Sequence, residues 1–77
     1  MLFYTVVRQF FKGDAEQHSV EIKDTLEDAR KRYFSIIVTD LNDNDITWQA
    51  AYIIDSNGLM VEGRVFDRRA IDAEQEG

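Results

Sequence analysis

The chain contains no cysteine and no proline, and only four of its 77 residues are glycine. Without cysteine there are no disulfide bonds, no thiolate zinc sites and no cysteine nucleophile. No apolar run approaches the roughly 20 residues that a transmembrane helix needs. The first residues also lack the basic start and small-residue cleavage site of a secretory signal. We therefore expect a cytoplasmic protein that has no membrane partner.

Positive charge is also scarce, because 9 basic residues stand against 15 acidic ones and the net charge is -6. Affinity for nucleic acid depends on neutralising phosphates, so we expect no nucleic-acid partner. Hydrophobic residues at 44% and charged residues at 31% are typical of a folded globular chain. This length predicts one domain with a small core. We place that domain at residues 1–67 and expect an acidic, frayed tail at residues 68–77.

Hydrophobic patterning predicts two strands before the helix. Residues 2–12 are rich in aromatic and β-branched side chains, which favour strands. Both faces of this segment carry aromatic residues, so we expect it to lie inside the sheet and to be buried on both sides. Residues 13–17 form a polar break, and the alternation over residues 18–23 indicates a short edge strand.

The strongest signal is that of a helix ending at Leu41. Asp24 or Thr25 can cap its first turn, and Glu27 or Asp28 follows three residues later as in a capping box. One apolar face recurs at helical spacing and consists of Leu26, Ala29, Tyr33, Ile36, Ile37 and Leu41. The Asn/Asp-rich segment 42–45 offers residues that can adopt the left-handed conformation that ends helices.

Residues 46–55 and 59–67 alternate around Asn57-Gly58, a strong hairpin signal. A loop with an even number of residues places Leu59, Val61 and Val65 on the face of Trp48, Tyr52 and Ile54. We expect that uniformly apolar face to pack on the helix, against Tyr33. The overall prediction is an α+β fold of order β-β-α-β-β, with one helix packed on a small, mostly antiparallel sheet.

No segment carries the pattern of a catalytic, cofactor or metal site. Residues 40–45 resemble the start of a calcium loop, but Asp45 and Ala51 stand where an EF-hand needs Gly and Glu. His18 and its neighbour Ser19 would point to opposite faces of a strand, so they cannot form a nucleophile–base pair. We therefore expect a protein that is not an enzyme and has no catalytic residues, no metal and no cofactor.

Large apolar side chains remain after the predicted core is assigned. One helix covers only one face of a sheet, and leftover apolar groups on a small chain indicate a partner surface. We expect self-association, with a dimer as the default, and an unknown protein partner. The predicted interface residues are Phe34, Val38, Ile53, Met60 and Phe66, with the sheet residues favoured over the helix flank.

The layout over residues 3–66 resembles small proteins encoded by phages and prophages of Gram-positive bacteria. The shared phrases are the opening strand Phe3-Tyr4-Thr5-Val6-Val7, the helix start Asp24-Thr25-Leu26-Glu27-Asp28-Ala29, the segment Arg32-Tyr33-Phe34-Ser35 and the turn Asp55-Ser56-Asn57-Gly58. The resemblance implies a phage or prophage setting and a non-enzymatic accessory role, with no residue roles to carry over. Two alternatives stay open: an acidic inhibitor that mimics nucleic acid, and a small-ligand sponge with a pocket at an oligomer interface.

Overall fold

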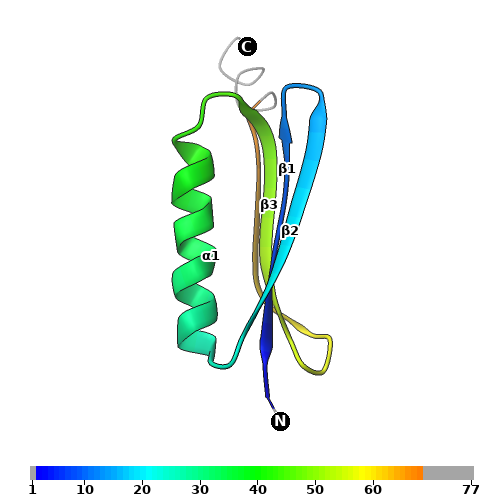
Figure 1. Ribbon diagram of the computed structural model, residues 1–77, viewed down its shortest axis with the longest axis vertical. Helices are drawn as coiled ribbons and strands as arrows, with labels where there is room; N and C mark the ends of the chain where they lie inside the picture. Colours follow the sequence, from blue (N-terminus) through cyan, green and yellow to red (C-terminus); the bar gives the residue numbers. More distant parts are fainter. Residues whose placement is uncertain (1, 69–77) are drawn as a thin grey trace.

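The computed structural model describes residues 2–68 as a four-stranded antiparallel sheet with one helix packed across it (Figure 1). The elements are β1 (Tyr4–Lys12), β2 (Ala15–Lys23), α1 (Leu26–Leu41), β3 (Ile46–Asp55) and β4 (Met60–Asp67). The strand order in space is β2-β1-β3-β4. This arrangement confirms the predicted α+β fold and the element order β-β-α-β-β. Within the described part of the chain, no helix is long and apolar enough to cross a membrane.

The first hairpin is longer than the sequence predicted. Lys12 pairs directly with Ala15, so the loop consists of Gly13 and Asp14 alone, and Gly13 has a φ of +63°. Glycine at the first central position is typical of the type II′ turns that join tightly paired strands. The polar break predicted at residues 13–17 is therefore wrong, because such a tight turn lets pairing begin at Ala15. Strand β1 lies inside the sheet and β2 at its edge, as predicted.

Helix α1 begins where its capping residues predict. The Thr25 hydroxyl accepts a hydrogen bond from the Asp28 backbone N–H at 3.1 Å, and Glu27 and Asp28 lie in the first turn, where the helix dipole favours acids. At the other end, Asn42 keeps a right-handed conformation with φ at -83°. The predicted left-handed ending is therefore wrong, and tertiary contacts hold this end of the helix instead.

The second hairpin combines a three-residue loop with a β-bulge. The Asp55 backbone N–H donates to the Leu59 carbonyl, and the Gly58 N–H donates to the Asp55 carbonyl, both at 2.9 Å. Only Gly58, at φ +83°, has a positive φ in this loop, whereas a type I′ turn needs two such residues. Because Asp55 pairs with Leu59, the loop consists of the three residues 56–58, and the predicted even-numbered loop is wrong.

The bulge restores the orientation of the β4 side chains, which a three-residue loop alone would have reversed. Ile54 pairs with Met60 but Ile53 pairs with Glu62, so Val61 is the extra residue. As a result, Val65 lies on the face of Trp48, as the alternation predicted. Val61 instead turns toward the helix, where it packs against the core.

The helix covers the face of the sheet opposite to the predicted one. Ile53 and Ala51 are fully buried beneath α1, whereas Trp48 and Tyr52 lie on the other face. The physical reason is that the helix-covered face also carries polar side chains, and the helix supplies their partners. The buried core cluster consists of Val6, Ala29, Tyr33, Ile36, Ile37, Ala51 and Ile53.

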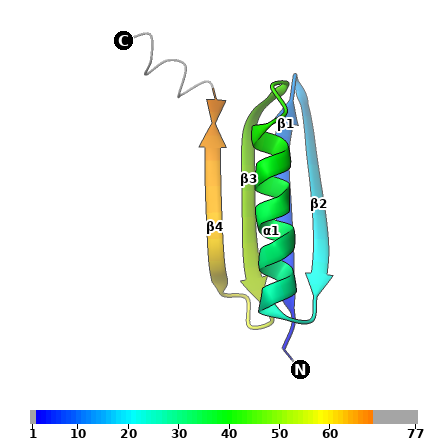
Figure 2. The same ribbon diagram turned by 90° about the vertical axis from the view of Figure 1, so that its left-hand side faces the viewer.

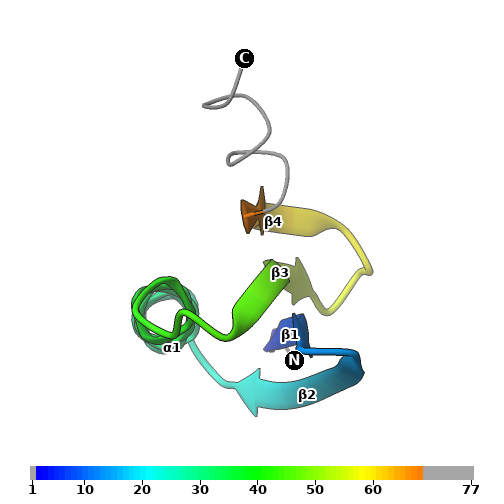
Figure 3. The ribbon, with the colours of Figure 1, turned by 90° about the horizontal axis from the view of Figure 1, so that it is seen from above.

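The two faces of the sheet are therefore in different environments. Figure 2 shows α1 lying over β1 and β3, with β4 set to one side of it. Figure 3, along the length of the molecule, shows that α1 packs on one side of the sheet only. Among residues 2–68, no element covers the opposite face.

Candidate interaction surface

The described chain has two candidate functional sites: a cluster of charged residues at the end of α1, and the uncovered face of the sheet. The charged cluster centres on Asp40, which is completely buried in the last turn of α1. Both of its carboxylate oxygens accept hydrogen bonds from the Arg8 guanidinium of β1, one of them from Nε at 2.9 Å. Gln49 of β3 donates a third hydrogen bond from Nε2 at 3.0 Å. The buried position of Asp40 does not follow from the sequence pattern, because an acid next to an Asn/Asp-rich loop has the pattern of a solvated residue.

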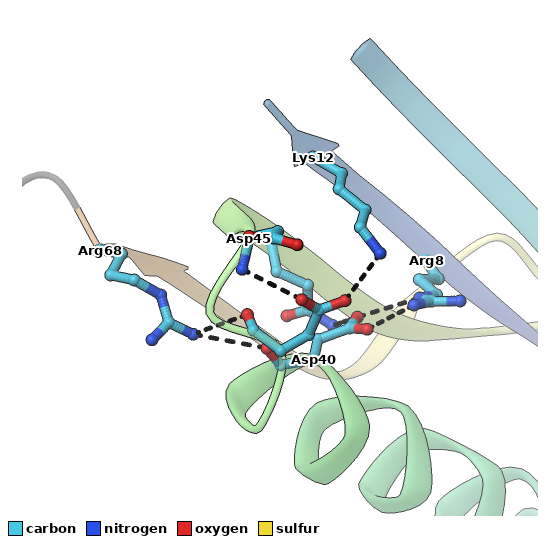
Figure 4. Close-up of polar contacts among 7 residues, drawn as sticks. Arg8, Lys12, Asp40, Asp45 and Arg68 are labelled. Carbon is cyan, nitrogen blue, oxygen red and sulfur yellow. Dashed lines mark hydrogen bonds and ion pairs between the residues drawn. The ribbon is translucent and has the colours of Figure 1, made fainter. Parts of the chain in front are cut away.

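Arg68 holds the same end of the helix from the end of β4 (Figure 4). Its Nε donates to the Ile46 carbonyl at 2.9 Å, and its terminal nitrogen donates to the Leu41 and Asp43 carbonyls at 3.2 and 3.4 Å. The last turn of α1 contains no basic residue of its own. Arg68 therefore supplies the positive charge that favours a helix C-terminus. Arg68 is the first residue of the predicted tail, and the rest of that tail, residues 69–77, lies outside the described residues.

Asp43 completes the cluster on its exposed side. The hydrogen bond from the Asp45 backbone N–H lowers the pKa of the Asp43 carboxyl, and the hydrogen bond from Lys12 lowers it further. The Lys12 ammonium lies 3.1 Å from this carboxylate (Figure 4). These charges hold the loop after α1 against the sheet, so their contacts are those of a structural cluster. No group of three or more metal-ligating side chains occurs within residues 2–68.

The second feature, the open face, is the sheet surface that faces away from α1. The strand register arranges it in four rows that cross β2, β1, β3 and β4 in that order. The first row lies beside the β1–β2 turn, and the fourth lies beside the β3–β4 turn. The rows are Glu16, Phe11, Trp48 and Asp67; then His18, Gln9, Ala50 and Val65; then Val20, Val7, Tyr52 and Gly63; and finally Ile22, Thr5, Ile54 and Met60.

The open face is mostly apolar, well exposed along its two edges and half-buried at its centre. Its most exposed large apolar side chains lie at the two edges: Ile22 at 65%, Val20 at 59%, Met60 at 64% and Val65 at 61% exposure. Surface apolar residues that occur singly are ordinary, but a contiguous apolar area of this kind marks a binding surface. Between the edges, the Phe11 and Trp48 rings meet edge to face with their centroids 5.6 Å apart.

Polar groups on the open face are concentrated at one end. The acids Glu16 and Asp67 lie at the two edges of the first row, and His18 and Gln9 lie in the second row. The Gln9 side-chain amide donates to Glu16 at 2.8 Å. The third and fourth rows carry no charged side chain. The face therefore has an aromatic end flanked by charged and polar groups, and an uncharged, mostly apolar end.

The structure separates the five predicted interface residues. Met60 lies on the open face, where its sulfur covers Gly63. Ile53 is 0% exposed beneath the helix, so its placement on an uncovered face is wrong. Phe66 pairs with Gln49 and lies on the helix-covered face, half-buried, with the Arg68 guanidinium 5.6 Å from its ring centroid. Phe34 and Val38 are exposed on the outer surface of α1, at 52% and 57%.

The sequence analysis missed Val20, Ile22 and Tyr52 as surface residues. The alternation over residues 18–23 predicts an edge strand but no interface residue, and the pattern of residues 46–55 predicts Tyr52 on the face under the helix. The available signal was the uniformly apolar face of β3 and β4. It correctly grouped Trp48, Tyr52, Ile54 and Val65, but it predicted that this face would lie under the helix.

Comparison with models of protein families, with curated proteins and with solved structures finds no match for this chain.

Proposed function

We propose that this protein is a non-enzymatic, self-associating accessory protein that acts by protein–protein binding, with the open face as its association surface. The observation that carries the proposal is the position of the helix, which covers the more polar face of the sheet and leaves the more apolar one exposed. Burial of a large aliphatic side chain is worth roughly 1.5–3 kcal/mol. Four such side chains at the edges, Val20, Ile22, Met60 and Val65, are more than half exposed.

The ion pairs of the protein favour binding through the open face of the sheet over binding through acidic side chains. Several acids are committed to ion pairs that fasten the helix to the sheet: Glu62 with Arg30, Glu21 with Arg32, and Asp40 with Arg8. An acidic inhibitor that mimics nucleic acid would need its carboxylates directed at the target. These local pairs therefore favour the protein-binding proposal over mimicry.

Light scattering at micromolar concentration tests the proposal with two matched variants. Ile22→Glu places a charge on the open face at a side chain that is 65% exposed, and Val38→Glu does the same on the outer surface of α1 at 57% exposure. Both substitutions are at exposed positions, so we expect both variants to fold. We expect an oligomeric wild type, an unchanged Val38→Glu variant and a dissociated Ile22→Glu variant.

Two outcomes contradict the proposal. A wild type that is monomeric throughout the micromolar range refutes self-association. An oligomer that Val38→Glu disrupts and Ile22→Glu leaves intact refutes the choice of the open face.

A further inference from the structure

We infer that the outer edge of β2 pairs with β2 of a second copy of this chain, antiparallel and centred on Ser19, so that the two sheets become one continuous sheet. Addition of a strand to an exposed sheet edge is a recurring mode of protein recognition. The edge is separate from the open face, and the inference shares with the proposed function only the identity of the partner.

The backbone of β2 leaves a regular row of hydrogen-bonding groups unpaired along its outer edge. Lys12 and Ala15 close the two-residue turn as a hydrogen-bonded pair, and such pairs then alternate along the two strands. Every second residue of β2 therefore directs its N–H and C=O groups away from β1. No strand among residues 2–68 pairs with this side of β2. The outward-directed groups belong to Glu16, His18, Val20 and Ile22.

The two edges of the sheet differ in how well they can accept another strand. Natural proteins blunt edge strands with bulges, charged side chains or proline. The edge strand β4 has the bulge at Val61, and it carries the charged residues Glu62 and Arg64. In contrast, β2 pairs with β1 along all 9 of its residues without a register shift, and it contains no proline. The edge of β2 is therefore the one suited to strand addition.

A second β2 fits this edge because its outward-directed groups have the same spacing. When the two Ser19 residues lie opposite each other, Glu16 of each copy faces Ile22 of the other. His18 likewise faces Val20, and each facing pair exchanges two hydrogen bonds. The contact then contains about eight backbone hydrogen bonds. A shift of two residues in either direction removes one facing pair, so hydrogen bonding selects the register centred on Ser19.

The side chains are compatible with the same register. On the helix side of the sheet, Gln17 lies opposite Glu21 of the second copy, where its amide can donate to the carboxylate. No two β2 residues of like charge lie opposite each other. The shifted register that sets Val20 opposite Val20 would place Glu16 opposite Asp24. Like charges placed directly opposite each other are destabilising, which disfavours that shift.

The edge contact would also enlarge the open face. Residues that lie opposite each other in an antiparallel pair direct their side chains to the same side of the sheet. The open faces of the two copies therefore lie on one side of the joined sheet, with Val20 and Ile22 of both copies near its centre. Edge pairing is thus compatible with association through the open face.

Cysteine cross-linking tests the contact in a chain that has no cysteine of its own. In the inferred register the two Ser19 Cα atoms are about 4.5 Å apart, as in a non-hydrogen-bonded pair, and a disulfide bond accepts that distance. Ser19 is exposed, so we expect Ser19→Cys to fold. The matched control is Gln17→Cys, which is exposed on the same side of the same strand. Two Gln17 Cα atoms would be roughly 14 Å apart, too far for a disulfide bond.

Oxidised glutathione serves as the oxidant, so that two protein thiols form one disulfide bond while it is reduced to two thiols. At the protein concentration of the light-scattering test, we expect Ser19→Cys to form the linked dimer about tenfold faster than Gln17→Cys. Denaturation in urea should remove the difference. The Ser19 side chain points away from the open face, so packing through that face does not bring two such thiols together.

Each outcome separates the edge contact from the proposed function. Equally slow cross-linking of the two variants, in a protein that scatters as an oligomer, overturns the edge contact while self-association stands. A disulfide between Ser19→Cys and Gln17→Cys in a mixed sample, with none between two Ser19→Cys chains, overturns the register. Selective cross-linking of Ser19→Cys in a protein that scatters as a monomer supports the edge contact and refutes association through the open face. A monomer without selective cross-linking overturns both.

Discussion

The two faces of the sheet differ in the interactions that stabilise them when they are buried. The covered face contains charged and amide side chains that lose their water under the helix, so each requires a partner in a defined position. Asp40 is the clearest case, because Arg8 and Gln49 converge on it from two strands. The open face carries its charged and amide groups at one end only, and over the rest of it the free energy of burial depends on area rather than on individual partners.

This difference explains why the helix packs on the less apolar face. Arg30 and Arg32 project from the two flanks of α1 toward opposite edges of the sheet, where they pair with Glu62 of β4 and Glu21 of β2. The helix is thus fixed in direction and position by polar contacts on both sides of its apolar stripe. The open face offers no acid at these positions, and it remains available for a partner with an apolar surface.

The largest expected effect is the loss of the Asp40 carboxylate. Asp40→Ala should lower the free energy of unfolding by about 3–5 kcal/mol, because it leaves the partly buried Arg8 without its counter-charge. Chemical denaturation measures this change. Glu27→Gln is the matched control, since Glu27 is 80% exposed in its pair with Lys31 and such pairs contribute about 0.3–0.5 kcal/mol. Similar losses in the two variants would show that the covered face does not depend on specific partners.

Ile53 and Ile54 provide a direct comparison of the faces, since they are neighbours on β3 that point to opposite sides. Ile53→Ala should destabilise the fold by about 2–5 kcal/mol at every protein concentration, because it opens a cavity in the monomer core. Ile54→Ala should have a smaller effect that grows with protein concentration, as expected for a side chain buried on association. Thermal unfolding over a range of concentrations separates the two. An Ile54→Ala effect that does not change with concentration would contradict the role of the open face.

A weaker effect is expected from the ionisation of Tyr33 under the helix. Burial raises the pKa of the Tyr33 hydroxyl above its ordinary value of 10.0, and Glu62 raises it further, against the lowering effect of Arg64. The unfolded chain therefore ionises first, so this stabilisation is present below pH 10 and is lost as the pH rises through the folded-state pKa. In thermal unfolding above pH 10, we expect wild type to lose stability more steeply than Tyr33→Phe. Parallel pH profiles for the two proteins would contradict this assignment.

The smallest expected effect concerns the acidic segment that follows the sheet. Residues 70–77 contain no patterned apolar face, so a chain that ends at residue 69 should unfold within about 1 kcal/mol of the full chain, against typical totals of 5–15 kcal/mol. The shortened chain keeps Arg68, which binds carbonyl groups at the end of α1. Removal of that side chain in Arg68→Ala serves as the contrasting variant and should cost more. A larger loss on truncation would indicate that the segment packs on the domain.

The sequence by itself determined the elements and their order, because these depend on local chemistry. The cap at Thr25, the helical spacing of Ala29 and Tyr33, and the glycines at the two hairpins each act within a few residues of their own position. The alternation along β3 and β4 also separated the side chains into nearly the correct two sets. Such patterns are visible without knowledge of what packs against them.

Only the tertiary structure decided which of the two faces the helix covers. Burial of apolar area would be favourable on either face of the sheet. The choice between the faces depends on ion pairs between residues far apart in the chain, such as Arg8 with Asp40 and Arg30 with Glu62. The bulge at Val61 is a second example, because it changes which side a residue faces without leaving a strong mark in the local sequence. Helix placement and strand register are properties of long-range contacts, and these contacts expose the apolar set of side chains that the sequence pattern alone assigned to the core.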